Sequence, residues 1–129
     1  MIVLDTHAWL WWNDDPARLG PTGREAIERA DSIGIASVSC WEVAMLALRG
    51  RIGLDRDVSV WVQHALLRRG VVAIPLSPKL AVEAAELDRA SFPGDPADRF
   101  IYATARTAGA LLVTRDARLL EFDPRGTLW

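Results

Sequence analysis

Four acidic residues, far apart in the sequence, are the side chains of this protein best suited to chemistry. They are Asp5, Glu42, Asp98 and Asp116. Carboxylates that share one site repel one another, and this repulsion destabilises a fold unless a cation lies between them. Hard divalent ions such as Mg²⁺ and Mn²⁺ prefer oxygen ligands. If the fold gathers these acids, the sequence predicts a metal-dependent site for phosphoryl transfer or hydrolysis.

The pattern of apolar runs predicts that the four acids meet at one edge of a parallel sheet. Short apolar runs predict buried strands at residues 2–4, 33–36 and 110–113. Asp5 and Asp116 follow the first and last of these strands, Glu42 falls early in a helix expected over 38–48, and Asp98 lies on the helix before the last strand. Crossover helices begin near the carboxyl ends of strands, where open α/β sheets place their ligand sites. We therefore expect one acidic site there.

The remaining elements complete an alternating pattern of strands and helices. Further helices are expected over residues 6–12, 22–30 and 57–69, after Ser77-Pro78, from Asp95-Pro96 to Gly109, and over 117–120, with another strand at 71–75. Such alternation is typical of an α/β sandwich built on a mostly parallel sheet. The length of 129 residues fits a single domain, residues 1–129.

Each acid also has a purely structural interpretation. Glu42 lies three residues after Ser39, the spacing of a capping box. Asp95 fits a helix N-cap with Asp98 as its reciprocal partner, and Asp116 fits the cap of a short helix. Capping and metal binding are compatible, because a capping carboxylate already lies near a positive helix end. The coincidence of these acids at one edge favours the chemical interpretation, with Asp95 as mainly structural.

Composition limits the classes of protein to consider. The formal net charge is −2, with 14 arginines and the single lysine Lys79 among 15 basic residues, so no overall basic character indicates nucleic-acid binding. Cys40 is the only cysteine, which excludes an intrachain disulfide and favours a reducing compartment. No apolar run is long enough to span a bilayer, and the first residues lack the pattern of a signal peptide. We expect a cytoplasmic protein without membrane contact.

Four stretches of the chain resemble motifs of the PIN domain family, in particular its VapC-type toxins. These stretches are Val3-Leu4-Asp5-Thr6, SVSCWEVA at 37–44, DPADRFIYATA at 95–105 and LVTRD at 112–116. The resemblance covers nearly the whole chain and implies a PIN-like three-layer α/β/α sandwich with a central sheet of four to five strands. It implies a Mg²⁺- or Mn²⁺-dependent endoribonuclease that acts as the toxin of a toxin–antitoxin pair.

The resemblance also implies roles for individual residues and partners. The catalytic acids would be Asp5, Glu42, Asp98 and Asp116, with the metal held by Asp5, Asp98 and Asp116. Thr6 and Thr114 would support the acids, and Arg99 and Arg115 would contact phosphate or an antitoxin. The implied partners are an RNA substrate, a cognate antitoxin and a second copy of the chain, in a homodimer and larger toxin–antitoxin assemblies.

Two alternative functions stay open at this point. One is a structure-specific DNA nuclease, and the other is a catalytically silent PIN-like interaction module. The six tryptophans include Trp41 and Trp61, which we expect to fill the core.

Overall fold

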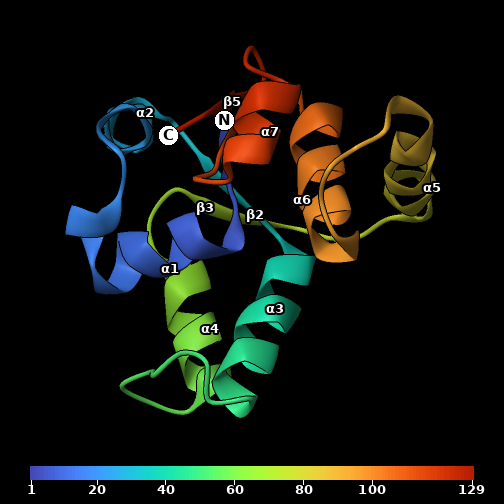
Figure 1. Ribbon diagram of the computed structural model, residues 1–129. Helices are drawn as coiled ribbons and strands as arrows, with labels where there is room; N and C mark the ends of the chain where they lie inside the picture. The colour runs from blue at the N-terminus through green and yellow to red at the C-terminus, as the bar shows by residue number, and fades with distance from the viewer.

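A five-stranded parallel sheet forms the centre of the computed structural model, which describes residues 1–129 (Figure 1). The strands are β1 (Ile2–Leu4), β2 (Ile33–Ala36), β3 (Val71–Ile74), β4 (Leu111–Val113) and β5 (Thr127–Leu128), in the spatial order β3-β2-β1-β4-β5. All four pairings are parallel. The predicted fold class is confirmed, and β5 is an addition that the apolar pattern did not predict.

Seven α-helices connect these strands. They are α1 (Thr6–Asp14), α2 (Pro21–Arg29), α3 (Ser37–Leu48), α4 (Val58–Leu67), α5 (Pro78–Glu86), α6 (Pro96–Thr107) and α7 (Ala117–Phe122). Short 3₁₀ helices cover Pro16–Arg18 (η1) and Leu87–Ala90 (η2). Ser77 caps α5 as its sequence predicted, because the Ser77 hydroxyl accepts from the Leu80 N–H at 3.1 Å. None of the helices has both the length and the apolar character needed to cross a membrane.

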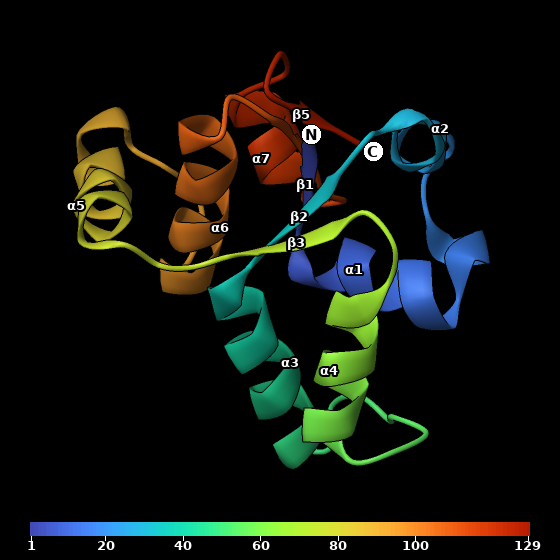
Figure 2. The same ribbon diagram turned by 180° about the vertical axis from the view of Figure 1, so that it is seen from behind.

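The sheet separates two apolar layers (Figures 1 and 2). Successive side chains of a strand point to opposite faces, so Ile2 and Leu4 pack with α1, α2, α3 and α4, whereas Val3 packs with α6 and α7. Trp9 of α1 is fully buried in the first layer. Helix α5 lies outside α6 and packs against it. The result is a three-layer α/β/α sandwich with α5 as an outer helix.

Strand register brings two of the predicted site residues to the same level. Leu4 pairs with Ile35 on one side and with Val113 on the other. Asp5 and Thr114 therefore leave the sheet side by side, and the Asp5 N–H donates to the Val113 carbonyl at 3.0 Å. Helix α3 starts directly after β2 at this same edge.

The two tryptophans expected in the core have different environments. Trp61 is buried, with 4% of its surface exposed, as predicted. The prediction for Trp41 is wrong, because 56% of its surface is exposed. Helix α3 leaves the carboxyl edge of the sheet (Figure 1), and Trp41 lies on the side of α3 that borders a surface groove lined by Met45 and Phe100.

Candidate functional site

Asp5 lies at the centre of the carboxyl edge and caps helix α1. Its Oδ1 accepts from the Ala8 N–H at 2.8 Å. Burial raises the pKa of Asp5 above its ordinary value, while the Thr114 hydroxyl, the Ala8 N–H and Arg115 act in the opposite direction. A raised pKa means that the surrounding protein stabilises the charged carboxylate less well than water does. A bound cation would supply the missing stabilisation.

Glu42 reaches the same edge from the second turn of α3. The Thr6 hydroxyl donates to Glu42 Oε1 at 2.5 Å and lies 3.2 Å from the buried Ser39 hydroxyl. The capping-box interpretation of Ser39 and Glu42 is wrong: α3 begins at Ser37, so Ser39 lies inside the helix. Burial raises the pKa of Glu42, and repulsion from Asp95 adds to that rise. Glu42 thus faces the acids of other elements rather than its own helix end.

Asp98 approaches Glu42 from the first turn of α6. Asp95 and Asp98 form the predicted capping box, with the Asp98 N–H donating to Asp95 Oδ1 at 3.0 Å and the Asp95 N–H donating to Asp98 Oδ2 at 3.2 Å. Burial, then repulsion from Asp95 and from Glu42, raises the pKa of Asp98 to about 7. Gly94 permits this packing, because a Cβ there would lie 2.6 Å from the Asp98 Cβ.

Asp116 differs from the other three acids because an arginine neutralises it. Arg118 Nη2 lies 2.9 Å from Asp116 Oδ2, and Arg118 Nε donates to Oδ1 at 3.2 Å. The hydrogen bonds from Arg118 lower the pKa of Asp116. Arg118 also donates to the Pro93 carbonyl at 3.0 Å and interacts with Asp98 and Asp95. A guanidinium therefore lies among the acids, where a cation is expected.

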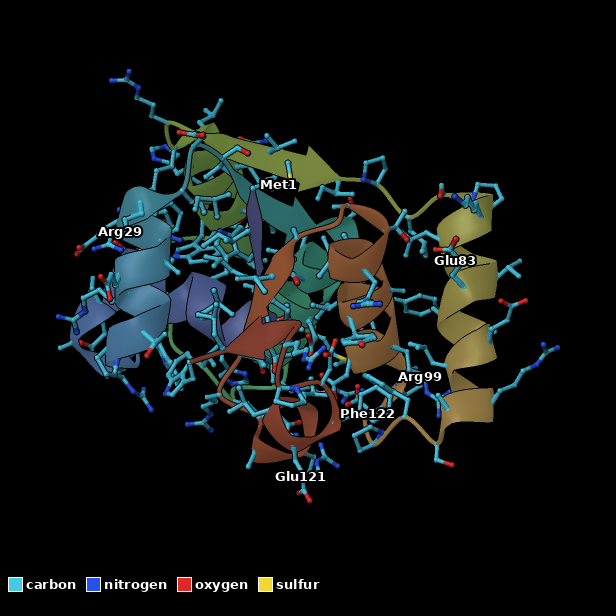
Figure 3. The ribbon with its side chains drawn as sticks, turned by 90° about the horizontal axis from the view of Figure 1, so that it is seen from above. Met1, Arg29, Glu83, Arg99, Glu121 and Phe122 are labelled. Atoms are coloured by element: carbon cyan, nitrogen blue, oxygen red, sulfur yellow. The ribbon has the colours of Figure 1, made fainter.

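The supporting residues divide into two groups. Thr6 holds Glu42, and the buried Thr114 accepts from the Asp116 N–H at 3.1 Å, so both threonines contact the acids. Arg115 acts on Asp5. Arg99 points away, since it pairs with Asp88 of η2 between α6 and α5 (Figure 3).

Two residues near the acids were not among the predicted site residues. Arg118 follows the N-cap Asp116 by two positions, the only signal available for its pairing. His7 lies in the first turn of α1, two residues after Asp5, and interacts with Glu42 and Arg115. The position of His7 in the sequence does not by itself predict these interactions.

The side chains gathered at this edge are of the type that binds a hard divalent ion. Asp5, Glu42, Asp98 and Asp116 offer only carboxylate oxygens, and burial raises the pKa of the first three. In their present rotamers, no three His, Cys, Asp or Glu side chains lie close enough to hold one ion. The Arg118 ion pair and the capping box both hold carboxylates in other hydrogen bonds, so ion binding requires these side chains to exchange partners.

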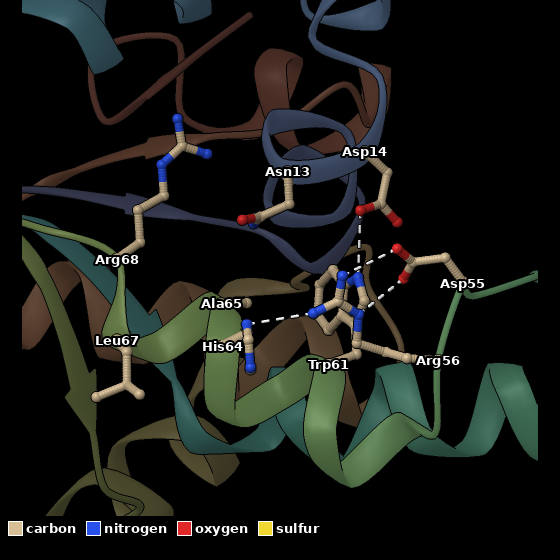
Figure 4. A pocket seen from close by; sticks show the side chains of 9 residues that line it. All are labelled: Asn13, Asp14, Asp55, Arg56, Trp61, His64, Ala65, Leu67 and Arg68. Atoms are coloured by element: carbon tan, nitrogen blue, oxygen red, sulfur yellow. Dashed lines mark hydrogen bonds and ion pairs between the residues drawn. The ribbon is translucent and has the colours of Figure 1, made fainter.

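Another cavity lies between α1 and α4 and has a volume of about 430 Å³ (Figure 4). Its polar groups already have partners: Arg56 pairs with Asp55 at 3.0 Å, and Trp61 Nε1 donates to Asp14 at 3.2 Å. Arg56 also lies 3.2 Å from His64 Nδ1. This cavity therefore offers no convergent unpaired groups.

Comparison with known proteins agrees with this geometry. The family model described as PIN domain matches residues 2–123. The chain is 44% identical to Ribonuclease VapC22 of Mycobacterium tuberculosis (strain ATCC 25618 / H37Rv), over 99% of this chain and 98% of that protein.

Solved structures share the fold at lower identity. One is a toxin–antitoxin complex from Klebsiella pneumoniae, with a TM-score of 0.69, 18% identity, and coverage of 100% of this chain and 97% of that one. Another is VapBC2 from Rickettsia felis bound to a DNA fragment from its promoter, with a TM-score of 0.68, 17% identity, and coverage of 99% and 98%. The chain therefore belongs to the PIN domain family, and within it to the group that contains Ribonuclease VapC22.

Proposed function

We propose that this protein is a Mg²⁺- or Mn²⁺-dependent endoribonuclease that acts as the toxin of a toxin–antitoxin pair. The observation that supports the activity is the set of carboxyl groups with raised pKa values, Asp5, Glu42 and Asp98, beside Asp116 at one sheet edge. The name of the 44% identical relative, a ribonuclease, supports RNA as the substrate.

Three acids would hold the divalent ion in this proposal: Asp5, Asp98 and Asp116. A bound divalent ion neutralises charge on a phosphoryl oxygen and lowers the pKa of a coordinated water. Asp116 joins the set when it releases Arg118, whose guanidinium then remains near the site as a partner for phosphate.

The other residues orient the reacting groups. Thr6 fixes the Glu42 carboxylate through a hydrogen bond of 2.5 Å. Burial raises the pKa of Glu42, which makes its carboxylate more basic toward an attacking water. Thr114 holds the turn that carries Asp116, through the Asp116 N–H. Glu42 would thus orient the water, or complete a second metal position.

The proposal includes partners and a location. Structural relatives named as toxin–antitoxin complexes support a cognate antitoxin for this chain. The exposed Trp41, with Met45 and Phe100, lines an apolar groove of about 320 Å³ that supports a homodimer contact. We place the protein in the cytoplasm. Light scattering tests the dimer, and suppression of cleavage by the product of a neighbouring small gene tests the antitoxin.

The decisive experiment measures cleavage of labelled RNA with Mg²⁺, with Mn²⁺ and with a chelator. Asp5→Asn and Asp98→Asn should abolish metal-dependent cleavage while the fold persists, because Asn keeps an oxygen for each cap. Asp31→Asn is the matched control, since Asp31 is exposed. Near-normal cleavage by both site variants would overturn the proposal. Cleavage of a DNA junction and not of RNA would assign the alternative activity, and no cleavage by any of the proteins would favour an interaction module.

A further inference from the structure

A basic cavity adjoins the acidic edge on the side of α1. The cavity has a volume of about 420 Å³, and its walls include Arg18, Arg51 and Arg115, together with Trp11 and His7. This volume lies within the range of small-ligand clefts, about 300–1,000 Å³. It offers room for part of a nucleotide chain.

The three arginines of this cavity have no ion-pair partner. None of them occurs in any ion pair of the structure. The cavity wall also contains the carboxylates of Asp14 and Asp15 against these three guanidinium groups. Asp14 accepts from Trp61 Nε1 in the neighbouring cavity (Figure 4). Guanidinium groups without partners, gathered around one hollow, indicate a site for an anion.

Trp11 holds two of these guanidinium groups in place. Arg18 lies 4.3 Å and Arg115 4.7 Å from the centre of the Trp11 ring. The Trp11 ring is buried and also packs on Trp129, at a centroid distance of 5.8 Å. Cation–π contacts on a buried ring reduce the conformational freedom of both arginines, so less entropy is lost when a ligand binds them.

Two residues that line the basic cavity, His7 and Arg115, also interact with the acidic site. Arg115 directly precedes Asp116 and acts on Asp5 across the edge. His7, two residues after Asp5, lines the cavity and interacts with Glu42. A polyanion with one phosphate at the acids would therefore have the arginines of this cavity as the neighbouring positive groups.

We infer that this cavity binds the phosphate backbone of the RNA next to the bond that is cut, with Arg18, Arg51 and Arg115 as its anion contacts. The inference rests on the proposed function for the identity of the ligand. A protein partner is less favoured, because three unpaired arginines beside a phosphodiester-cleaving site match the regular charge of a nucleic acid backbone.

Binding of a short labelled single-stranded RNA, measured by fluorescence anisotropy in chelator over a series of salt concentrations, tests the inference without cleavage. Each lost phosphate contact reduces the slope of log K against log salt by about 0.7 for a single strand. Arg18→Gln and Arg51→Gln should each reduce the slope by about this amount and weaken binding on the order of fivefold. Arg18→Lys should restore most of the slope, because the charge and not the packing on Trp11 determines it.

Arg29→Gln is the matched control for net charge. Arg29 ends α2 on the opposite side of the sheet from α6 (Figure 3), and it pairs with the exposed Glu25 at 2.7 Å. This variant should bind RNA with the slope of the unchanged protein. In metal, Arg18→Gln should raise KM and leave kcat unchanged, as expected for a residue that binds substrate away from the reacting bond.

The possible failures are distinguishable. If the unchanged protein cleaves RNA but the Arg18 and Arg51 variants keep its slope and KM, the inference fails and the proposed function stands. If the variants lose RNA binding but no protein cleaves, the nuclease proposal fails and the basic site stands. Absence of RNA binding by the unchanged protein overturns the inference, as does a loss confined to binding of a cognate antitoxin.

Discussion

Replacing Asp98 with Asn should stabilise the metal-free protein at neutral pH while it abolishes cleavage. The Asp98 carboxyl group is packed against Asp95 and interacts with Glu42, and burial followed by this repulsion raises its pKa to about 7. Asn removes the charge and keeps an oxygen that accepts from the Asp95 N–H, a bond of 3.2 Å in the structure. A gain in stability with a loss of activity is typical of residues that serve function at a cost to the fold.

The pH dependence gives the size of the effect. In the unfolded chain Asp98 ionises near an ordinary pKa of about 3.9, whereas in the folded protein it keeps its proton up to about pH 7. The folded protein thus binds more protons between these values, so the free energy of unfolding falls as pH rises from about 4 to about 7. The full difference between the two pKa values corresponds to about 4 kcal/mol in the free energy of unfolding. Asp98 is only partly buried, and solvent screening reduces the effect to about 1–2 kcal/mol.

Urea unfolding in chelator, at several pH values from acidic to slightly alkaline, measures this effect. The two proteins should have equal stability below about pH 4, and Asp98→Asn should be more stable by about 1–2 kcal/mol above about pH 7. Asp31→Asn, at an exposed position, should follow the unchanged protein. A decrease in stability of Asp98→Asn at every pH, or an unchanged pH dependence, would refute the reasoning.

Three further predictions follow from individual contacts. Thr6→Val should lower the free energy of unfolding at neutral pH by about 1–3 kcal/mol in urea, because Glu42 loses its hydroxyl donor; unchanged stability would contradict the role of this bond. Arg118→Gln should strengthen Mn²⁺ binding, measured by calorimetry, by up to about fivefold, because the ion no longer competes with an exposed ion pair, and equal or weaker binding would show that Arg118 does not compete. At protein concentrations where light scattering shows a monomer, Trp41→Ala should change the free energy of unfolding by less than about 0.5 kcal/mol, whereas Trp9→Ala should lower it by about 3–5 kcal/mol; comparable losses under these conditions would show that Trp41 packs inside its own chain.

The sequence was sufficient where a local signal determines the structure. The apolar runs before Asp5 and before Thr114 end where strands β1 and β4 end, because burial on both faces of a parallel sheet demands continuous apolar residues. The spacing of Asp95 and Asp98 predicted their reciprocal cap, which depends only on residues of one turn. Strand β5 escaped prediction because two residues, Thr127 and Leu128, are too few to show a period.

Tertiary contacts determine the features that the sequence predicted wrongly or did not predict. Glu42 matched a local cap with Ser39, but the hydroxyl of Thr6 on another helix is its partner. Arg99 and Arg115 each adjoin an acid in the sequence, yet only Arg115 acts on the site. Consecutive helical residues diverge by about 100°, so Arg99 points away from Asp98 to a different partner. The basic cavity draws on η1, the loop after α3 and the end of β4, and no local pattern joins these segments.

Anomalous diffraction from crystals of the protein soaked in Mn²⁺ tests the central claim most directly, namely that carboxylates from separate elements share one divalent ion. We expect an anomalous peak bounded by oxygens of Asp5, Asp98 and Asp116, with Arg118 displaced from its present bond to Asp116. The peak should disappear in crystals of Asp98→Asn. A Mn²⁺ ion found elsewhere, or no ion while Arg118 stays bound to Asp116, would contradict the assignment of this edge as the catalytic metal site.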